Sequence, residues 1–330
     1  MSGRVTSAEV AARAGVSRSA VSRVFSGASA SKATERKVRK AAADLGYRPN
    51  VLARSLITGR SRIIGLVVSY LDNQFYPDAL ERLSEALQAE GYHILVFTAP
   101  EAEEPDALVE QMLDYQVDGI IAASVTIGGD LAARCQAAGI PVVLFNRGQD
   151  ASGLSQVTSA NRTGGAEVAR FLRAGGHGRI AQITGWLGAS TGRDRAEGFR
   201  AAAGPLVAEA DGMFDRDRAA ELAAAMWRDA RPDAIFVGND HMAFGAIDAL
   251  RSEGAAVGRE VSVVGYDDVA AAAWGAYDLT TLRQPARRMA EATVETLLAL
   301  VEDPDRGAAR IEIEGPLVVR GSARVPEGWA

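Results

Sequence analysis

The chain has 330 residues, of which 48% are hydrophobic and 24% charged, and its formal net charge is −6. This is the composition of an ordinary globular protein with enough residues for two or three domains. No apolar run approaches the ~18 residues that span a membrane. Charged residues also interrupt the N-terminus where a signal peptide has its apolar core. A single cysteine, Cys135, excludes an intramolecular disulfide. We therefore expect a cytoplasmic protein without a membrane partner.

The charge is distributed unevenly along the chain. Residues 1–62 contain 13 Lys and Arg against three acidic residues, a net charge of +10, whereas the remainder has 23 against 39, a net charge of −16. A basic head on an acidic body predicts that the head alone binds a polyanion such as DNA.

The first 26 residues predict two short helices joined by a tight turn. Thr6 or Ser7 can cap the first helix, and Glu9 in its first turn meets the helix dipole. Gly15 suits the left-handed residue that ends a helix, and Ser17 suits the cap of the next one. In the second helix the apolar residues pack inward, which leaves an outward face of Arg18, Ser19, Ser22 and Arg23. This arrangement predicts a helix-turn-helix that enters the major groove.

A third helix is expected between Ser31 and Gly46. Its outer surface carries basic residues that either form a solvated face or contact DNA phosphates: Lys32, Arg36, Lys37, Arg39 and Lys40. Residues 50–57 predict one or two further helical turns. An isolated helix this short is marginal in water, so it requires a partner, which is its twin in a dimer, the DNA, or both.

From Ser61 onward, buried strands alternate with amphipathic helices. The predicted strands are 63–68, 93–98, 119–123, 141–145, 180–184, 234–237, 261–266 and 311–313. The predicted helices are 78–90, 104–115, 130–138, 161–173, 194–203, 216–229, 241–252 and 286–301. Continuously apolar strands indicate parallel sheets covered on both faces. The fold class is therefore α/β: an all-α helix-turn-helix head, then a two-lobed body of doubly wound parallel sheets.

Ligands of such sheets bind beyond the carboxyl ends of the strands. The segments at those ends carry aromatic rings, arginines, amides and carboxylates, a combination that suits a polyhydroxylated ring. Simpler roles are open for several of them. Asn239 and Asp240 form a possible cap pair, Asp267 or Asp268 a possible helix cap, and Phe214 a possible core residue.

Signals of catalysis are weak. The chain has no G-x-S-x-G elbow, Walker loop, H-E-x-x-H motif or spaced Cys/His cluster. The three histidines are scattered along the sequence. We expect no catalytic residues, no metal and no cofactor, and hence no enzyme.

The sequence of the head and its continuation resembles a known family. The resemblance rests on Glu9-Val10-Ala11, Gly15-Val16-Ser17, Val21-Ser22-Arg23-Val24, Leu45-Gly46-Tyr47-Arg48-Pro49-Asn50 and Ala53-Arg54-Ser55-Leu56. These motifs resemble the lactose-repressor (LacI/GalR) family of bacterial transcription regulators, and the resemblance extends over essentially the whole chain. It implies a ligand-responsive regulator, most simply a repressor, that binds double-stranded operator DNA as a homodimer.

The resemblance also implies domain boundaries and site residues. Residues 1–48 would form the DNA-binding domain, 49–60 the hinge helix and linker, and 61–330 the effector-binding and dimerisation domain. Its first lobe would span 61–160 plus 286–314, and its second 161–285 plus 315–330. The implied DNA-binding residues are Thr6, Ser17, Arg18, Ser19, Ser22, Arg23, Asn50, Ala53, Arg54 and Leu56, with Leu56 wedged into the minor groove. The implied effector-binding residues are Phe75, Tyr76, Asn146, Arg147, Arg195, Phe214, Asn239 and Asp267.

The implied effector is a small molecule in the inter-lobe cleft, a sugar or sugar derivative. Asn146-Arg147 departs from the acidic or aromatic pairs of several sugar-binding relatives, so a sugar acid or phosphorylated sugar stays open. The alternative reading is a sugar-binding or sugar-modifying protein with an N-terminal helix-turn-helix. The chain end has no leucine heptads to support a tetramerising tail.

Overall fold

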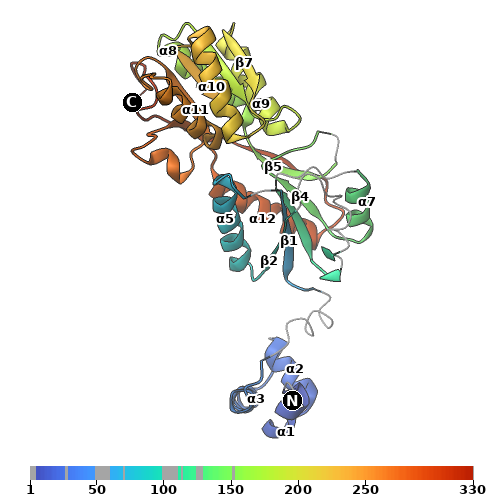
Figure 1. Ribbon diagram of the computed structural model, residues 1–330. Helices are drawn as coiled ribbons and strands as arrows, with labels where there is room; N and C mark the ends of the chain where they lie inside the picture. The colour runs from blue at the N-terminus through green and yellow to red at the C-terminus, as the bar shows by residue number, and fades with distance from the viewer. Residues whose placement is uncertain are drawn as a thin grey trace. The chain divides into compact units, whose positions relative to one another are not determined.

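The computed structural model describes residues 5–26, 29–48, 60–69, 71–98, 111, 112, 114–123, 129–150 and 153–329. The chain divides into two compact units, Met1–Arg62 and Ile63–Ala330 (Figure 1). Among the described residues, no helix is both long and apolar enough to cross a membrane.

The first unit contains three helices: α1 (Ser7–Ala14), α2 (Arg18–Ser26) and α3 (Lys32–Leu45). The predicted N-terminal cap of α1 is confirmed as a capping box, in which Glu9 N–H donates to Thr6 Oγ1 and Thr6 N–H donates to Glu9 Oε2 at 2.7 Å. These hydrogen bonds from Thr6 lower the pKa of Glu9. Gly15 and Gly46 end α1 and α3 in the left-handed conformation, with φ of 66° and 65°.

A small apolar core holds the three helices together. It consists of Val10, Ala11, Val21, Val24, Val38, Ala41 and Ala42, with the rings of Phe25 and Tyr47 5.7 Å apart at its edge. Each helix contributes to it, so the orientation of α2 is fixed by the apolar stripe on its inner side.

The second unit is built on two six-stranded sheets (Figure 1). In spatial order the first contains β11 (Arg310–Ile313), β5 (Ser155–Ser159), β4 (Val142–Phe145), β3 (Gly119–Ala123), β1 (Ile63–Val68) and β2 (His93–Thr98). The second contains β12 (Leu317–Val318), β10 (Thr280–Arg283), β9 (Ser262–Asp267), β8 (Ala234–Val237), β6 (Ile180–Thr184) and β7 (Ala208–Asp211). All neighbouring strands are parallel except β12, which runs antiparallel to β10.

Helices flank both sheets. They are α5 (Phe75–Ala89), α7 (Gly129–Ala137), α8 (Asn161–Ala174), α9 (Ser190–Ala203), α10 (Arg216–Ala230), α11 (Asp240–Ser252), the 3₁₀ turn η1 (Ala270–Ala273) and α12 (Ala286–Glu302). Helices α5 and α12 pack side by side on the first sheet, and α8 packs on α9 beside the second (Figure 1).

Most predicted elements are confirmed, and the differences have local causes. The expectation that 93–98 is a buried strand is wrong in its burial, because β2 is an edge strand and five of its six residues are exposed or half-buried. Helix α5 begins at Phe75 instead of 78, since a proline at its third position is tolerated in a first turn. The predicted helix 104–115 lies largely outside the described residues. Strands β5, β7, β10 and β12 were not predicted.

Candidate functional site

The outward face of α2 is fixed by the packing beneath it. Arg18, Ser19, Ser22 and Arg23 are all exposed. Ser17 caps the helix by accepting a hydrogen bond from Ala20 N–H at 3.2 Å. The hydroxyl oxygens of Ser17 and Ser19 are 2.9 Å apart, and Arg23 Nε donates to the carbonyl of Ser19 at 3.4 Å. The structure thus presents hydroxyls and guanidiniums on one accessible helix surface.

The basic residues of α3 fall into two groups. Arg39 pairs with Glu35 at 2.9 Å and Lys40 with Asp44 at 3.4 Å. The exposed Lys32, Arg36 and Lys37 have no such pair with any described residue. These three side chains are therefore the better candidates for contacts with DNA phosphates. The predicted DNA-binding residues Asn50, Ala53, Arg54 and Leu56 lie outside the described residues.

In the second unit, the predicted site residues Arg195 and Asp267 meet at the carboxyl ends of the second sheet. Asp267 ends β9 and Arg195 lies in the second turn of α9, and both are almost completely buried. Their closest atoms are 3.4 Å apart. Arg195 also donates to Asn161 Oδ1 and to the carbonyl of Gly238, each at 2.8 Å, and its guanidinium lies 3.8 Å from the centre of the Tyr266 ring.

Two glycines allow α9 to bring Arg195 to this position. A Cβ on Gly165 of α8 would lie 2.2 Å from the Arg195 carbonyl oxygen, and one on Gly198 of α9 would lie 1.9 Å from that of Arg162. The two helices therefore touch backbone to backbone.

Asp267 connects three parts of the unit. Besides Arg195, it accepts hydrogen bonds from Gln284 Nε2 at 2.7 Å and from Asn73 Nδ2 at 3.5 Å. Asn73 in turn accepts from Phe75 N–H at the start of α5. Burial raises the pKa of Asp267, while the charge of Arg195 and the hydrogen bonds oppose that rise.

A second buried carboxyl, Asp240, lies at the start of α11. It accepts from Thr281 Oγ1 at 2.6 Å and from Val269 N–H at 3.0 Å. Complete burial raises its pKa well above the ordinary value, and the nearby charge of Asp267 adds to the effect. We expect Asp240 to hold its proton more readily than an exposed aspartate.

Asn146 and Arg147 follow β4, where Asn146 takes a left-handed φ of 67°. Asn146 Nδ2 donates to the Tyr76 hydroxyl at 3.2 Å. Arg147 lies with its guanidinium carbon 5.4 Å from the centre of the Trp186 ring. Both residues are buried. The structure therefore brings Tyr76, Asn146 and Arg147 together, with Trp186 added from the second sheet.

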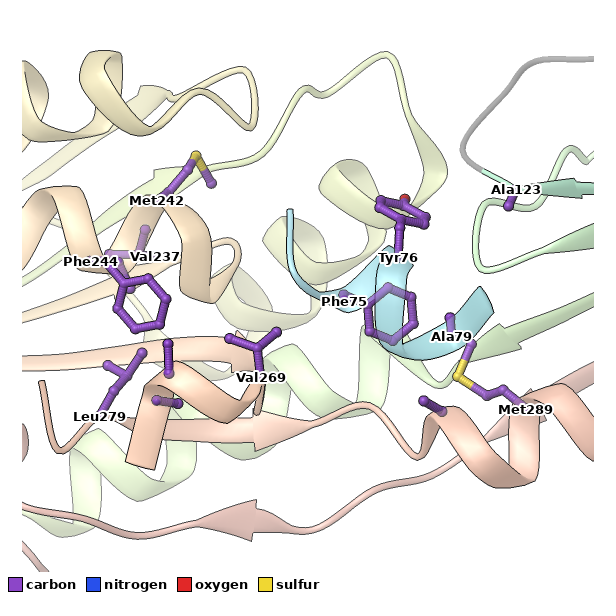
Figure 2. Packing of buried hydrophobic residues seen from close by; sticks show 14 of the residues in the cluster. Phe75, Tyr76, Ala79, Ala123, Val237, Met242, Phe244, Val269, Leu279 and Met289 are labelled. Carbon is purple, nitrogen blue, oxygen red and sulfur yellow. The ribbon is translucent and has the colours of Figure 1, made fainter. Parts of the chain in front are cut away.

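The remaining predicted site residues have structural partners. Phe75 stacks on Phe145 at 6.3 Å, and Figure 2 shows it at the first turn of α5 on the side of Ala79 and Met289. Asn239 caps α11 by accepting from Met242 N–H at 2.9 Å, which is the cap role held open from the sequence. Phe214, with a left-handed φ of 58°, packs so closely on Gly185 that a Cβ there would clash with its ring.

A cavity of 490 Å³ borders part of this site. Phe75, Asp267 and Gln284 line it, together with Asp268 and Arg283, which form an ion pair at 2.6 Å. Asp268 also pairs with Arg320 at 2.7 Å, so its role is to hold β10 and the C-terminal segment. Of the two aspartates, Asp267 is the one that faces Arg195.

Residues 6–50 match the family model described as bacterial regulatory proteins, lacI family, and residues 64–305 match the periplasmic binding protein domain. The chain is 30% identical over 331 residues to the HTH-type transcriptional repressor PurR of Vibrio vulnificus, covering 96% of this chain and 98% of that protein.

The chain belongs to the lacI family of bacterial regulatory proteins. Solved structures of the family superpose along almost its full length. The lac repressor dimer bound to operator and the anti-inducer ONPF has a TM-score of 0.87 at 28% identity, with 97% of this chain and 99% of that chain covered. The complex of the transcriptional regulator CelR with cellobiose has a TM-score of 0.72 at 31% identity, covering 97% and 100%.

The sequence did not predict several residues of this candidate site. Gln284 follows β10, a strand that was not predicted, so nothing marked it as a strand-end residue. Tyr266 and Asn161 were assigned to a strand and a helix without a site role. Asn73 and Trp186 were noted at strand ends but not chosen. The signal available for all of them was position at the carboxyl end of a strand or the start of the next helix.

Proposed function

We propose that this protein is a cytoplasmic, homodimeric transcriptional repressor that binds a pseudo-palindromic operator and is controlled by a sugar or sugar derivative bound between its two lobes. It acts by binding and performs no catalysis. The observation that carries the proposal is the exposed face of Arg18, Ser19, Ser22 and Arg23 on a capped, well-packed α2. Guanidiniums and hydroxyls on a helix of this kind read base edges in the major groove.

The body supports the ligand control. Arg195 and Asp267 give a buried pair with opposite charge at the carboxyl ends of the second sheet, while Tyr76 and Asn146 bring a hydroxyl and an amide from the first. A molecule with several hydroxyls requires both donors and acceptors. PurR and the lac repressor are relatives with this architecture. The reading as a sugar-modifying enzyme has no comparable support, because the relatives named above are transcriptional repressors.

Fluorescence anisotropy on labelled DNA from upstream of its own gene tests the proposal, with salt held constant because the phosphate contribution is strongly salt-dependent. Titration with a panel of sugars and sugar derivatives should change the affinity for that DNA. Binding no tighter than to random DNA under every condition would contradict the repressor function.

The role of α2 is tested in the same assay with Arg23→Ala. We expect a loss of about 1–3 kcal/mol on the operator and relaxed specificity at one base pair per half-site. Arg39→Ala is the matched control, since Arg39 is paired with Glu35 on the solvent side of α3. Equal losses for Arg23→Ala on operator and random DNA would assign Arg23 to a phosphate instead.

A further inference from the structure

Arg147 is buried and, unlike the neighbouring Arg193 and Arg195, forms no ion pair with a described residue. It is 5% exposed, and its Nε has no hydrogen-bond partner. By contrast, Arg193 pairs with Asp150 and Asp194, and Arg195 pairs with Asp267. No carboxylate among the described residues pairs with Arg147. A buried charge without compensation is unfavourable, so the fold retains here a positive charge that its own residues do not neutralise.

The start of helix α9 is a second source of positive potential close to Arg147. Gly148 N–H donates to Ser190 Oγ at 2.9 Å, which ties the segment after β4 to the first residue of α9. Helix α9 has neither a side-chain cap at Ala189 nor an acidic residue in its first turn. The free N–H groups and dipole at such a helix start attract anions.

The indole ring of Trp186 lies beside Arg147 and is closely packed. Arg147 lies over Trp186, and a Cβ on Gly188 would lie 2.5 Å from the indole. Glycine at 188 therefore leaves the space that the indole occupies. A guanidinium over a ring face keeps its N–H edge available for a planar or tetrahedral oxyanion.

Asn146 adds a neutral polar atom beside the charge. Its Nδ2 donates to Tyr76, and its Oδ1 is buried without a hydrogen-bond partner. Reversing the amide would give Tyr76 the oxygen and leave the NH₂ group alone instead. In either orientation one polar atom at this position lacks a partner that a ligand hydroxyl can supply.

We propose that the effector is an anionic sugar derivative, a sugar acid or a sugar phosphate, whose charged group is bound by Arg147 and the start of α9 and whose adjacent hydroxyl is bound by Asn146. This inference rests on the proposed function, since it defines the ligand of the same site. We expect the ligand to be negatively charged because the guanidinium of Arg147 is buried and forms no ion pair with any described residue.

The test compares ligands that differ in charge and variants that differ in one arginine. D-gluconate, D-glucose 6-phosphate, D-glucose and inorganic phosphate are titrated into the full-length protein at constant ionic strength, and binding is measured by calorimetry and by the shift in melting temperature. Wild type should bind at least one of the two anionic sugars more tightly than D-glucose. Arg147→Met should weaken that binding by about tenfold to a hundredfold, as expected for hydrogen bonds to a charged group.

Arg193→Met is the matched control, because it removes a nearby charge that is already paired; its effect should stay within about twofold. A response to gluconate alone identifies a sugar acid, and a response to the phosphates alone identifies a sugar phosphate. The inference is overturned if D-glucose binds as tightly as both anionic sugars. It is also overturned if no anionic probe binds wild type more tightly than Arg147→Met.

The DNA assay separates failure of this inference from failure of the proposed function. If a neutral sugar changes operator affinity and the anionic probes do not, ligand control stands and the anionic effector is wrong. If an anionic probe binds through Arg147 but leaves operator affinity unchanged at saturation, the anionic site stands and ligand control of DNA binding is wrong.

Discussion

Replacement of Arg195 by methionine tests whether the buried ion pair organises the site. Methionine keeps most of the side-chain volume but removes the donors to Asn161, Gly238 and Asp267. Each hydrogen bond from a charged donor contributes about 1.5–3 kcal/mol, although coupled bonds do not add in full. Loss of one partner of a buried pair costs about 3–5 kcal/mol, because the other charge stays buried. We therefore expect the free energy of unfolding to fall by about 3–5 kcal/mol.

Urea unfolding of the full-length protein, followed by far-UV circular dichroism, measures this loss. The transition of the larger unit is the relevant one, since Arg195 lies in that unit and a chain of two compact units need not unfold in a single step. Arg193→Met is the control on the same helix: Arg193 is more than a third exposed, and its ion pairs should contribute only about 0–1 kcal/mol. If the two variants lose the same small amount, the network around Asp267 does not hold the site, and the reasoning from burial is wrong.

Further predictions use the same unfolding experiment. Arg147→Met should leave the free energy of unfolding of the ligand-free protein unchanged or raise it, because it removes an unpaired buried charge; a loss above about 2 kcal/mol would reveal a structural partner. Gly198→Ala should lower it by at least about 1–3 kcal/mol, since the added Cβ meets the Arg162 carbonyl; a neutral result would mean that α8 and α9 separate freely. Burial raises the pKa of Asp240 above its ordinary 3.8, so the folded state holds a proton that the unfolded chain loses. The contribution of this proton to the free energy of unfolding is fully present below pH 3.8 and is lost as the pH rises through the folded-state pKa. Asp240→Asn should therefore reduce the fall in the free energy of unfolding with rising pH, and an unchanged pH profile would contradict this prediction.

The head could be predicted from the sequence in some detail because its signals are local. The capping box of Thr6 and Glu9, and the left-handed glycines at 15 and 46, are short-range patterns with one physical reading. The apolar side of α2 followed from helical spacing alone. The inferred outward face did not depend on knowing what α2 packs against.

The body was predicted where strands are continuously apolar and missed where they are short or polar. Six apolar or small residues made β1 unambiguous, whereas β7, with the sequence Ala-Glu-Ala-Asp, has no strand signal. Missing β10 hid Gln284 as a strand-end residue. The pairing of Arg195 with Asp267 joins residues 72 positions apart, and no local pattern encodes such a contact. The unpartnered state of Arg147 is equally a tertiary property, visible only when its neighbours are known.

The contacts between the two sheets suggest how a ligand could control their arrangement. Four hydrogen bonds that involve side chains join residues of the first sheet's lobe to the second: Asn73 to Asp267, Gly148 to Ser190, Ser159 to Tyr266, and Arg193 to Asp150. At about 0.5–1.5 kcal/mol each, the four bonds together contribute about 2–6 kcal/mol, a range that includes the ~5.5 kcal/mol of differential ligand affinity that a nearly complete switch requires.

An anion held between Arg147 and the start of α9 would contact both lobes at once. Arg147 follows a strand of the first sheet, whereas α9 belongs to the second. The two would bind the same oxyanion only while the Gly148–Ser190 hydrogen bond keeps them close. The binding free energy of the charged group is then available to one arrangement of the lobes and not to the other, which is the condition for a ligand to shift a conformational equilibrium. A neutral sugar without that group would lose this differential term even where its hydroxyls still bind.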